Sequence, residues 1–186
     1  MEYYSLRLCG LTRQLPLVHI SKKTRLANFT ILGDVELVDK VAGAIAGKLK
    51  NLDFDYLTGP EVKVVPLLHE IARRLKHKRF IVCRKRVLPY MVDPIILKPL
   101  PYFPKHVQPL VINGPDALLL KKKKVVIIDD VISTGVTMRM MKKLMEKVGA
   151  QIVLFVTVIR QGKQFDQIEN LFYLADIPVF TEKNNS

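Results

Sequence analysis

Strands with long apolar runs that alternate with amphipathic helices are the feature that most constrains this fold. The segments 54–59, 79–84, 124–130 and 151–159 read as strands, and the last three are rich in β-branched residues. Strands that are hydrophobic throughout are typical of a parallel sheet whose two faces are both covered by helices. The sequence therefore predicts an α/β domain with a parallel sheet flanked by helices.

Three helices are predicted, one before the first of these strands and two between them. In 34–50, apolar residues recur at helical spacing after Asp34, which is a suitable N-cap residue. The predicted inward face of this helix consists of Val35, Val38, Val41, Ala42, Ile45, Ala46 and Leu49. A second helix is expected over 66–75 and a third over 137–148, where Gly149 is a favourable stop. Short strands are expected at both ends of the chain, which otherwise lack a clear period.

Length and composition fit one globular domain, 1–186. A chain of 186 residues with 49% hydrophobic and 25% charged residues can bury a substantial core. Cys9 and Cys83 lie far apart and lack metal-binding spacing, and the sequence shows no secretory signal. We therefore expect two reduced thiols in a cytoplasmic protein. No apolar run reaches the roughly 18 residues that a membrane span needs, so no membrane partner is expected.

The net charge of +13 is unusual for an ordinary globular domain. Basic proteins of this kind bind nucleic acids, membrane surfaces or phosphate-rich small molecules. Over half of the excess charge lies in 84–124, which also contains most of the prolines. From 86 to about 115 the periodicity fails, which is typical of a functional loop with room for a hairpin.

The segment VVIIDDVISTGVTM, residues 125–138, joins a strand to a helix through two carboxylates and a turn rich in hydroxyl groups. Ligands of open parallel sheets bind beyond the carboxyl ends of the strands, where Asp129 and Asp130 are expected. Small residues before a helix N-terminus suit a phosphate, while carboxylates accept hydrogen bonds from ribose hydroxyls or bind a divalent metal. The segment as a whole therefore predicts a sugar-phosphate site. For the two aspartates alone, the structural alternative is that they only cap the turn after the strand. Neither of the common glycine-rich nucleotide motifs, GxxxxGK[ST] and GxGxxG, occurs in the chain.

The stretch VVIIDDVISTGVT closely resembles the ribose-5-phosphate signature of the type I phosphoribosyltransferases. LTGPEVKVVPLLHEIARRL resembles their pyrophosphate loop and the helix after it, and VCRKRVLPYM the strand end before their mobile catalytic loop. FTILGDVELVDKVA is similar to the N-terminal helix of adenine phosphoribosyltransferases and their relatives. The resemblance implies a Rossmann-like sheet with a small hood from about 1–30 and 170–182 and a mobile basic loop over about 86–112.

This family transfers ribose 5-phosphate from phosphoribosyl pyrophosphate (PRPP) to a nitrogenous base, with Mg²⁺, and releases pyrophosphate. By resemblance, the residues that bind the 5-phosphate would be Asp130, Ser133, Thr134, Gly135, Val136 and Thr137. Those that bind pyrophosphate would be Pro60, Glu61, Val62, Lys63, Arg84 and Lys85. The residues expected to be catalytic are Asp129, Asp130, Lys63, Arg84 and Lys85. The Mg²⁺ ion would be bound through the substrate, with Asp129 as its candidate protein ligand.

Three features bear on the binding of PRPP or of the base. Val64 and Val136 stand where the family commonly has glycine, but every charge and hydroxyl is kept, so PRPP binding is expected to be intact. The mobile loop lacks the acidic residues that many adenine-specific members carry there. Phe29 is a candidate for stacking on the base, with core packing as the alternative.

The leading hypothesis is a purine phosphoribosyltransferase, with adenine as the favoured base and a homodimer implied by the resemblance. One alternative is a PRPP-binding transcriptional or RNA-binding regulator, which the charge favours. The absence of a helix-turn-helix segment and the gathering of charge around the substrate site make nucleic acid a poor partner. The other alternative is a phosphoribosyltransferase that accepts xanthine, hypoxanthine/guanine or orotate. The run Lys121–Lys124 is interpreted as a solvated approach to a strand.

Overall fold

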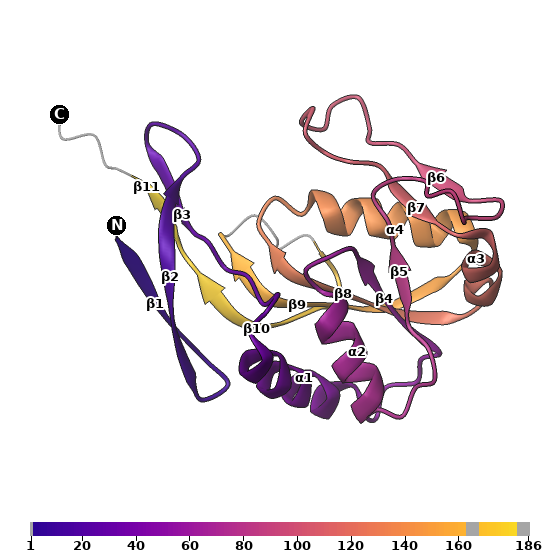
Figure 1. Ribbon diagram of the computed structural model, residues 1–186, viewed down its shortest axis with the longest axis horizontal. Coiled ribbons are helices and arrows are strands. Elements are labelled where there is room, and N and C mark those ends of the chain that lie inside the picture. The colour runs from indigo at the N-terminus through magenta and orange to yellow at the C-terminus, as the bar shows by residue number, and fades with distance from the viewer. Residues whose placement is uncertain (1, 163–167, 182–186) are drawn as a thin grey trace.

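The computed structural model describes residues 2–162 and 168–181, and a five-stranded parallel sheet forms its centre (Figure 1). The sheet order is β10-β9-β8-β4-β5, and every neighbouring pair is parallel. The strands are β4 (Tyr56–Pro60), β5 (Ile81–Cys83), β8 (Lys124–Ile132), β9 (Gln151–Gln161) and β10 (Leu171–Ile177). The predicted α/β class with a parallel sheet is confirmed.

Helices cover both faces of this sheet (Figure 1). One face carries α1 (Val35–Leu49) and α2 (Val65–Arg74), and the other carries α3 (Gly114–Leu120) and α4 (Val136–Val148). Each pair buries its own hydrophobic cluster against the strands, which is why the strands are apolar on both faces. None of the helices in the described ranges is long and apolar enough to cross a membrane.

The predicted first helix is confirmed with one correction to its inward face. Asp34 caps it, because its Oδ1 accepts a hydrogen bond from the backbone N–H of Leu37 at 3.0 Å. Val35, which we assigned to the buried face, is 82% exposed, and Leu37 is buried instead. Val35 is the first residue of the helix, and the predicted period holds from Val38 onward.

A second, antiparallel sheet in the order β1-β2-β3-β11 stands beside the central one. Its strands are β1 (Tyr3–Leu8), β2 (Leu11–His19), β3 (Thr24–Ala27) and β11 (Val179–Thr181). The predicted hood segment 170–182 is divided between the two sheets, because β10 extends the central sheet and only β11 joins the small one. Residue 182 lies outside the described residues. The buried Gln161 links the sheets, because its Nε2 donates to the carbonyl oxygen of Ala27 at 3.2 Å.

The proline-rich segment contains a two-stranded hairpin, as the sequence allowed. The strands are β6 (Ile95–Leu97) and β7 (Leu110–Ile112). The second strand is buried and bridges to Arg84, so it belongs to the core although we placed it in the mobile loop. We call the connecting residues, 98–109, the arm; they project beyond the hairpin on the α4 side of the sheet (Figure 1).

Candidate active site

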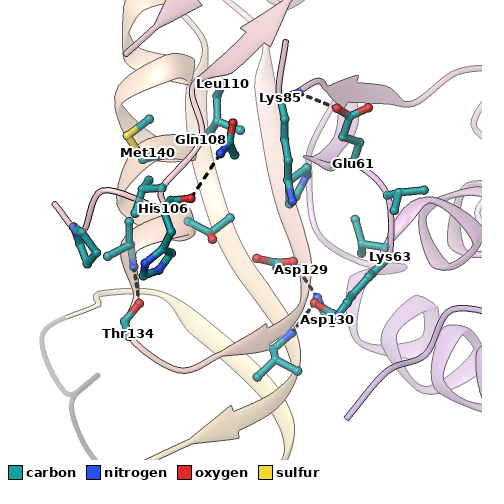
Figure 2. Close-up of a pocket in the computed structure, with 18 residues that line it drawn as sticks. Glu61, Lys63, Lys85, His106, Gln108, Leu110, Asp129, Asp130, Thr134 and Met140 are labelled. Atoms are coloured by element: carbon teal, nitrogen blue, oxygen red, sulfur yellow. Dashed lines mark hydrogen bonds and ion pairs between the residues drawn. The ribbon is translucent and has the colours of Figure 1, made fainter. Parts of the chain in front are cut away.

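A cavity of about 450 Å³ lies at the carboxyl ends of β4 and β8 (Figure 2). Four segments far apart in the sequence line it: the 60–64 loop at the end of β4, Lys85 after β5, residues 104–110 of the arm and β7, and the segment from the end of β8 to the start of α4. The last segment contains Asp129 and Asp130, which belong to β8, and residues 133–137, which we call the 133–137 turn. The cavity therefore lies where open parallel sheets bind their ligands.

Asp129 and Asp130 form the floor of the cavity, and each is only 7% exposed. The backbone N–H of Asp130 donates to Oδ1 of Asp129 at 2.9 Å, and that of Val131 donates to Oδ1 of Asp130 at 3.0 Å. Burial, followed by the neighbouring charge of Asp130, raises the pKa of Asp129 well above its ordinary value. Burial also raises the pKa of Asp130, although the positive charge of Lys63 opposes this. The pair is poised to accept hydrogen bonds from a ligand.

Lys63 projects from the 60–64 loop toward Asp130 (Figure 2). Its Nζ lies 3.9 Å from Oδ2 of Asp130, and its side chain is 51% exposed. This Oδ2 atom is buried and has no hydrogen-bond partner within the described ranges of the chain. A buried carboxylate oxygen in this state is costly unless a ligand supplies a donor or a cation, so the atom marks a binding position.

Glu61 connects the 60–64 loop to the end of β5. Its Oε2 lies 2.7 Å from Nε of Arg84, and its Oε1 accepts a hydrogen bond from the backbone N–H of Lys85 at 2.7 Å. These contacts place Lys85 on the cavity wall. Arg84 was predicted beside Lys85 as a pyrophosphate ligand, but it pairs with Glu61 and does not line the cavity.

The 133–137 turn has the form of an anion site. Gly135 adopts φ 70°, which favours glycine, and α4 begins at the next residue without a side-chain cap. The first N–H groups of a helix lack intrahelical acceptors and point toward its positive end. Five of the six residues predicted to bind the 5-phosphate, Ser133, Thr134, Gly135, Val136 and Thr137, line a recess of about 30 Å³. The sixth, Asp130, lines the main cavity instead. Thr134, Val136 and Thr137 also line the main cavity, so the recess opens beside the carboxylate pair.

The arm supplies cavity residues that sequence reasoning missed. His106 and Gln108 line the cavity on the side opposite Lys63 (Figure 2), and Gln108 Nε2 donates to the carbonyl oxygen of His106 at 3.5 Å. No periodic pattern marks these residues as part of a site. The signal that could have indicated them is their type, since they are the one histidine and the one glutamine of the arm, which has no acidic residue.

Phe29, the candidate for base stacking, lies away from these residues. It is 4% exposed, belongs to the hydrophobic cluster on the α1 side of the sheet, and does not line the cavity. Its placement agrees with the core-packing alternative, because a buried ring offers no face to a ligand in this conformation.

The donor set fits a hard cation that is shared with a substrate. The carboxylate oxygens of Asp129 and Asp130 are ligands that Mg²⁺ prefers, and Oδ2 of Asp130 is free to accept. Within residues 2–162 and 168–181 there is no group of three His, Cys, Asp or Glu side chains arranged to hold a metal. An Mg²⁺ ion would therefore complete its coordination with substrate oxygens and water.

Comparisons with known proteins agree with this geometry. No curated protein sequence matches the chain significantly. Among solved structures, the adenine phosphoribosyltransferase of Thermoanaerobacter pseudethanolicus is 21% identical, with a TM-score of 0.67 over 88% of this chain and 95% of that one. The adenine phosphoribosyltransferase of Leishmania tarentolae is 18% identical, with a TM-score of 0.68 over 94% of this chain and 83% of that one. That of Rhodothermus marinus is 20% identical, with a TM-score of 0.63 over 95% of this chain and 94% of that one.

At these identities the likeness to solved structures shows a shared fold. The family relationship comes from the sequence itself, since the model of the phosphoribosyl transferase domain matches residues 31–183. This match covers most of the chain, including both carboxylates, the 60–64 loop and the 133–137 turn. The chain belongs to the phosphoribosyl transferase domain family.

Proposed function

We propose that the protein is a purine phosphoribosyltransferase that transfers ribose 5-phosphate from PRPP to adenine and releases pyrophosphate. One observation carries this proposal: a single cavity brings together two buried carboxylates, a helix N-terminus suited to phosphate, and the cations Lys63 and Lys85. These groups are complementary to the ribose hydroxyls, the 5-phosphate and the pyrophosphate of PRPP, respectively.

The 5-phosphate would occupy the recess at the 133–137 turn. The N–H groups at the start of α4 and the hydroxyls of Ser133, Thr134 and Thr137 donate to its oxygens, and the positive end of the helix dipole favours its charge. Val136 keeps its backbone N–H, so the branched side chain at this position removes no donor. The ribose hydroxyls would then donate to the carboxylates, with Oδ2 of Asp130 as the free acceptor.

Transfer breaks the bond between C1 of the ribose and the pyrophosphate oxygen, and pyrophosphate leaves with the electron pair. A nitrogen of the base forms the new bond to C1 and gives up its proton, which is balanced by the released pyrophosphate. Lys63 and Lys85 balance the charge that grows on the leaving group, while Asp129 and Asp130 stabilise the positive charge that develops on the ribose. Asp129 is the candidate protein ligand for an Mg²⁺ ion bound through the substrate, and such an ion would supply further charge neutralisation for pyrophosphate.

The arm would protect this reaction from water. Its residues already line the cavity opposite the 60–64 loop, and closure would exclude the water that otherwise hydrolyses the donor. His106 and Gln108 would present polar groups from this side to the base or the phosphate. The predicted mobility of the loop is part of this proposal.

Adenine is the favoured base because the structural neighbours described above are adenine phosphoribosyltransferases. Xanthine, hypoxanthine/guanine and orotate are the rival acceptors. Two further parts of the proposal are a homodimer, which rests on the family resemblance, and a cytoplasmic location, which rests on the expected reduced state of Cys9 and Cys83.

A PRPP-binding regulator of transcription or of RNA is the second candidate, and the net charge of +13 favours it. The run Lys121–Lys124, which leads into β8, supports this candidate less in the folded chain than its charge alone suggests. Lys123 pairs with Asp55 at 3.1 Å, and Lys124 pairs with Asp53 at 2.5 Å. Half of this run is therefore paired with carboxylates, which reduces its value as a nucleic-acid surface.

Pyrophosphate release separates these candidates. The protein would be incubated with PRPP and Mg²⁺ and with adenine, hypoxanthine, guanine, xanthine or orotate in turn. We expect turnover with adenine, and its loss in the double variant Asp129→Asn, Asp130→Asn, which keeps the side-chain shapes but removes both charges. Binding of PRPP without turnover on any base would favour the regulator.

A further inference from the structure

Arg139, in the first turn of α4, has contacts in two directions. Its Nη2 donates to the carbonyl oxygen of Thr134 at 3.1 Å. Its guanidinium carbon lies 5.7 Å from the centre of the Phe103 ring, in cation–π range. Thr134 belongs to the 133–137 turn and Phe103 to the arm, so one side chain joins two separate walls of the cavity.

The position of Arg139 is not explained by helix electrostatics. Cations in the first turn of a helix are unfavourable because they face the positive end of the dipole. The first turn of α4 has no acidic residue to compensate this charge. The contacts with Thr134 and Phe103 therefore account for the side chain's placement.

The bond to Thr134 has a consequence for the anion site. The carbonyl group of Thr134 and the N–H group of Gly135 belong to the same planar peptide unit and point in opposite directions. By holding the carbonyl oxygen, Arg139 fixes the direction in which the Gly135 N–H points. Gly135 lines the recess, so this N–H is one of the donors available to a phosphate there.

The hairpin and the arm each contact α4. In the hairpin, Nζ of Lys147 donates to the carbonyl oxygen of Ile96 in β6 at 3.0 Å. In the arm, Phe103 contacts Arg139 and also packs edge-on against Tyr102, with 5.0 Å between the ring centroids. His106 follows Phe103 by three residues, so the seat of Phe103 on Arg139 helps to set where His106 meets the cavity.

We propose that Arg139 is a positioning residue that couples phosphate binding at the 133–137 turn to the seating of the arm. A phosphate bound at the turn fixes the peptide that Arg139 holds, and this fixes the guanidinium on which Phe103 rests. Conversely, a seated Phe103 favours the peptide orientation that binds phosphate, as reciprocity between linked sites requires. The identity of the natural ligand rests on the proposed function, whereas the coupling requires only a sugar phosphate.

Fluorescence gives a direct readout, because the chain contains no tryptophan. Phe103→Trp introduces a single reporter that keeps an aromatic face for Arg139. We expect its emission to change as ribose 5-phosphate saturates the site, and we expect Arg139→Ala in the same background to abolish this change. Calorimetry should show ribose 5-phosphate binding weakened by about two- to fivefold in that variant, the range for an exposed cation–π contact. Lys143→Ala, which removes an exposed cation from the same helix, is the matched control and should keep both signals.

Kinetics give the second readout. Arg139→Ala and Phe103→Leu should each raise the KM for PRPP about two- to fivefold, and the double variant should be no worse than the poorer single variant. Arg139→Lys keeps the charge but not the planar fork, so it should restore only part of the affinity. Additive effects of the two substitutions on the KM for PRPP would overturn the coupling. So would an emission change that persists in the Arg139→Ala variant, or one that is absent from Phe103→Trp itself. Intact fluorescence coupling without turnover on any base would support the coupling and overturn the proposed function.

Discussion

Nζ of Lys63 lies 3.9 Å from Oδ2 of Asp130, the buried carboxylate oxygen that lacks a hydrogen-bond partner in the described ranges. Lys63 belongs to the 60–64 loop and Asp130 to the end of β8, so the pair spans the proposed donor site. The lysine opposes the burial that raises the pKa of Asp130. One cation thus serves two purposes, since it is available to the pyrophosphate and it favours the charged form of a carboxylate beside the ribose.

Replacing Lys63 with alanine should weaken PRPP binding and alter the pH dependence of the reaction. We expect the KM for PRPP to rise about tenfold, as for the loss of one charge-assisted contact. The pKa of Asp130 should rise further, so the acidic limb of the rate profile should move to higher pH. Initial rates between pH 5 and 9 test both effects. Lys50→Ala, an exposed lysine just after α1, is the control, and an effect of the same size there would point to net charge instead of the pair.

The acidic pair should lower the stability of the protein at neutral pH. Folding raises the pKa of Asp129 and Asp130, so the folded chain retains protons that the unfolded chain releases. This contribution favours the folded state below the ordinary aspartate pKa of about 3.9 and is lost as the pH rises through the raised values. Asp129→Asn removes one charge without changing the shape of the side chain. We therefore expect a higher Tm at pH 7.5, by about 2–4 °C for each kcal/mol gained.

A second aspartate is the matched control for this measurement. The pKa of Asp55 is lowered, first by the backbone N–H of Lys124 and then by the side chain of Lys123. Its stabilisation is present above the ordinary pKa and is lost as the pH falls, so Asp55→Asn should lower the Tm at pH 7.5. Thermal unfolding of both variants between pH 4.5 and 8 should show shifts of opposite sign. A lower Tm for Asp129→Asn at pH 7.5 would refute the assignment.

Gly59, just before the 60–64 loop, cannot be enlarged without disturbing the sheet. A Cβ at this position would lie 2.5 Å from the carbonyl oxygen of Ile128, a backbone atom of the neighbouring strand. Gly59→Ala should therefore lower the free energy of unfolding by about 1–3 kcal/mol. Gly47→Ala, in α1, meets nothing within 4 Å and should instead add about 0.5–1 kcal/mol. Urea denaturation compares the two, and equal effects would contradict the packing shown here.

The two thiols should differ in reactivity. Burial raises the pKa of Cys83 to about 12, and the residue lies in β5 under the α3–α4 cluster. Cys9 is only partly buried, at the turn between β1 and β2. A thiol reagent at pH 8 should label Cys9 while the protein is folded and Cys83 only after unfolding, since the thiolate is the reactive form. Cys9→Ser should abolish the fast phase; a fast phase that survives in this variant would show that Cys83 is accessible.

The sequence predicted the parts of the fold that repeat with a clear period. The helices α1 and α2 and the strands β8 and β9 each have enough apolar residues for the pattern to outweigh local exceptions such as Val35. The helix α3 was missed, and the hairpin of β6 and β7 was expected only as a possibility without bounds. Seven and three residues are too short to show a period, and prolines surround these elements. Propensity alone does not reveal that Leu110–Ile112 is buried, since its partners are distant in sequence.

The candidate site was predictable to a similar extent. The carboxylates and the 133–137 turn are contiguous in sequence, and their types imply their chemistry, so their meeting at one cavity was foreseen. The contribution of His106 and Gln108 depends on how the arm folds back over α4, which no local pattern encodes. The pairing of Arg84 with Glu61 likewise depends on two segments that meet only in the folded chain.

Transfer of ribose 5-phosphate, in contrast to mere binding or hydrolysis of PRPP, fixes the ratio of the two products, and measuring this ratio tests the proposed reaction. The protein would be mixed with PRPP, Mg²⁺ and adenine, and pyrophosphate and nucleoside monophosphate would be measured in the same sample over time. We predict that the two appear in equal amounts, and that neither appears with the Asp129→Asn, Asp130→Asn variant. Pyrophosphate without nucleotide, or PRPP left intact with every purine base, would contradict transfer to a purine.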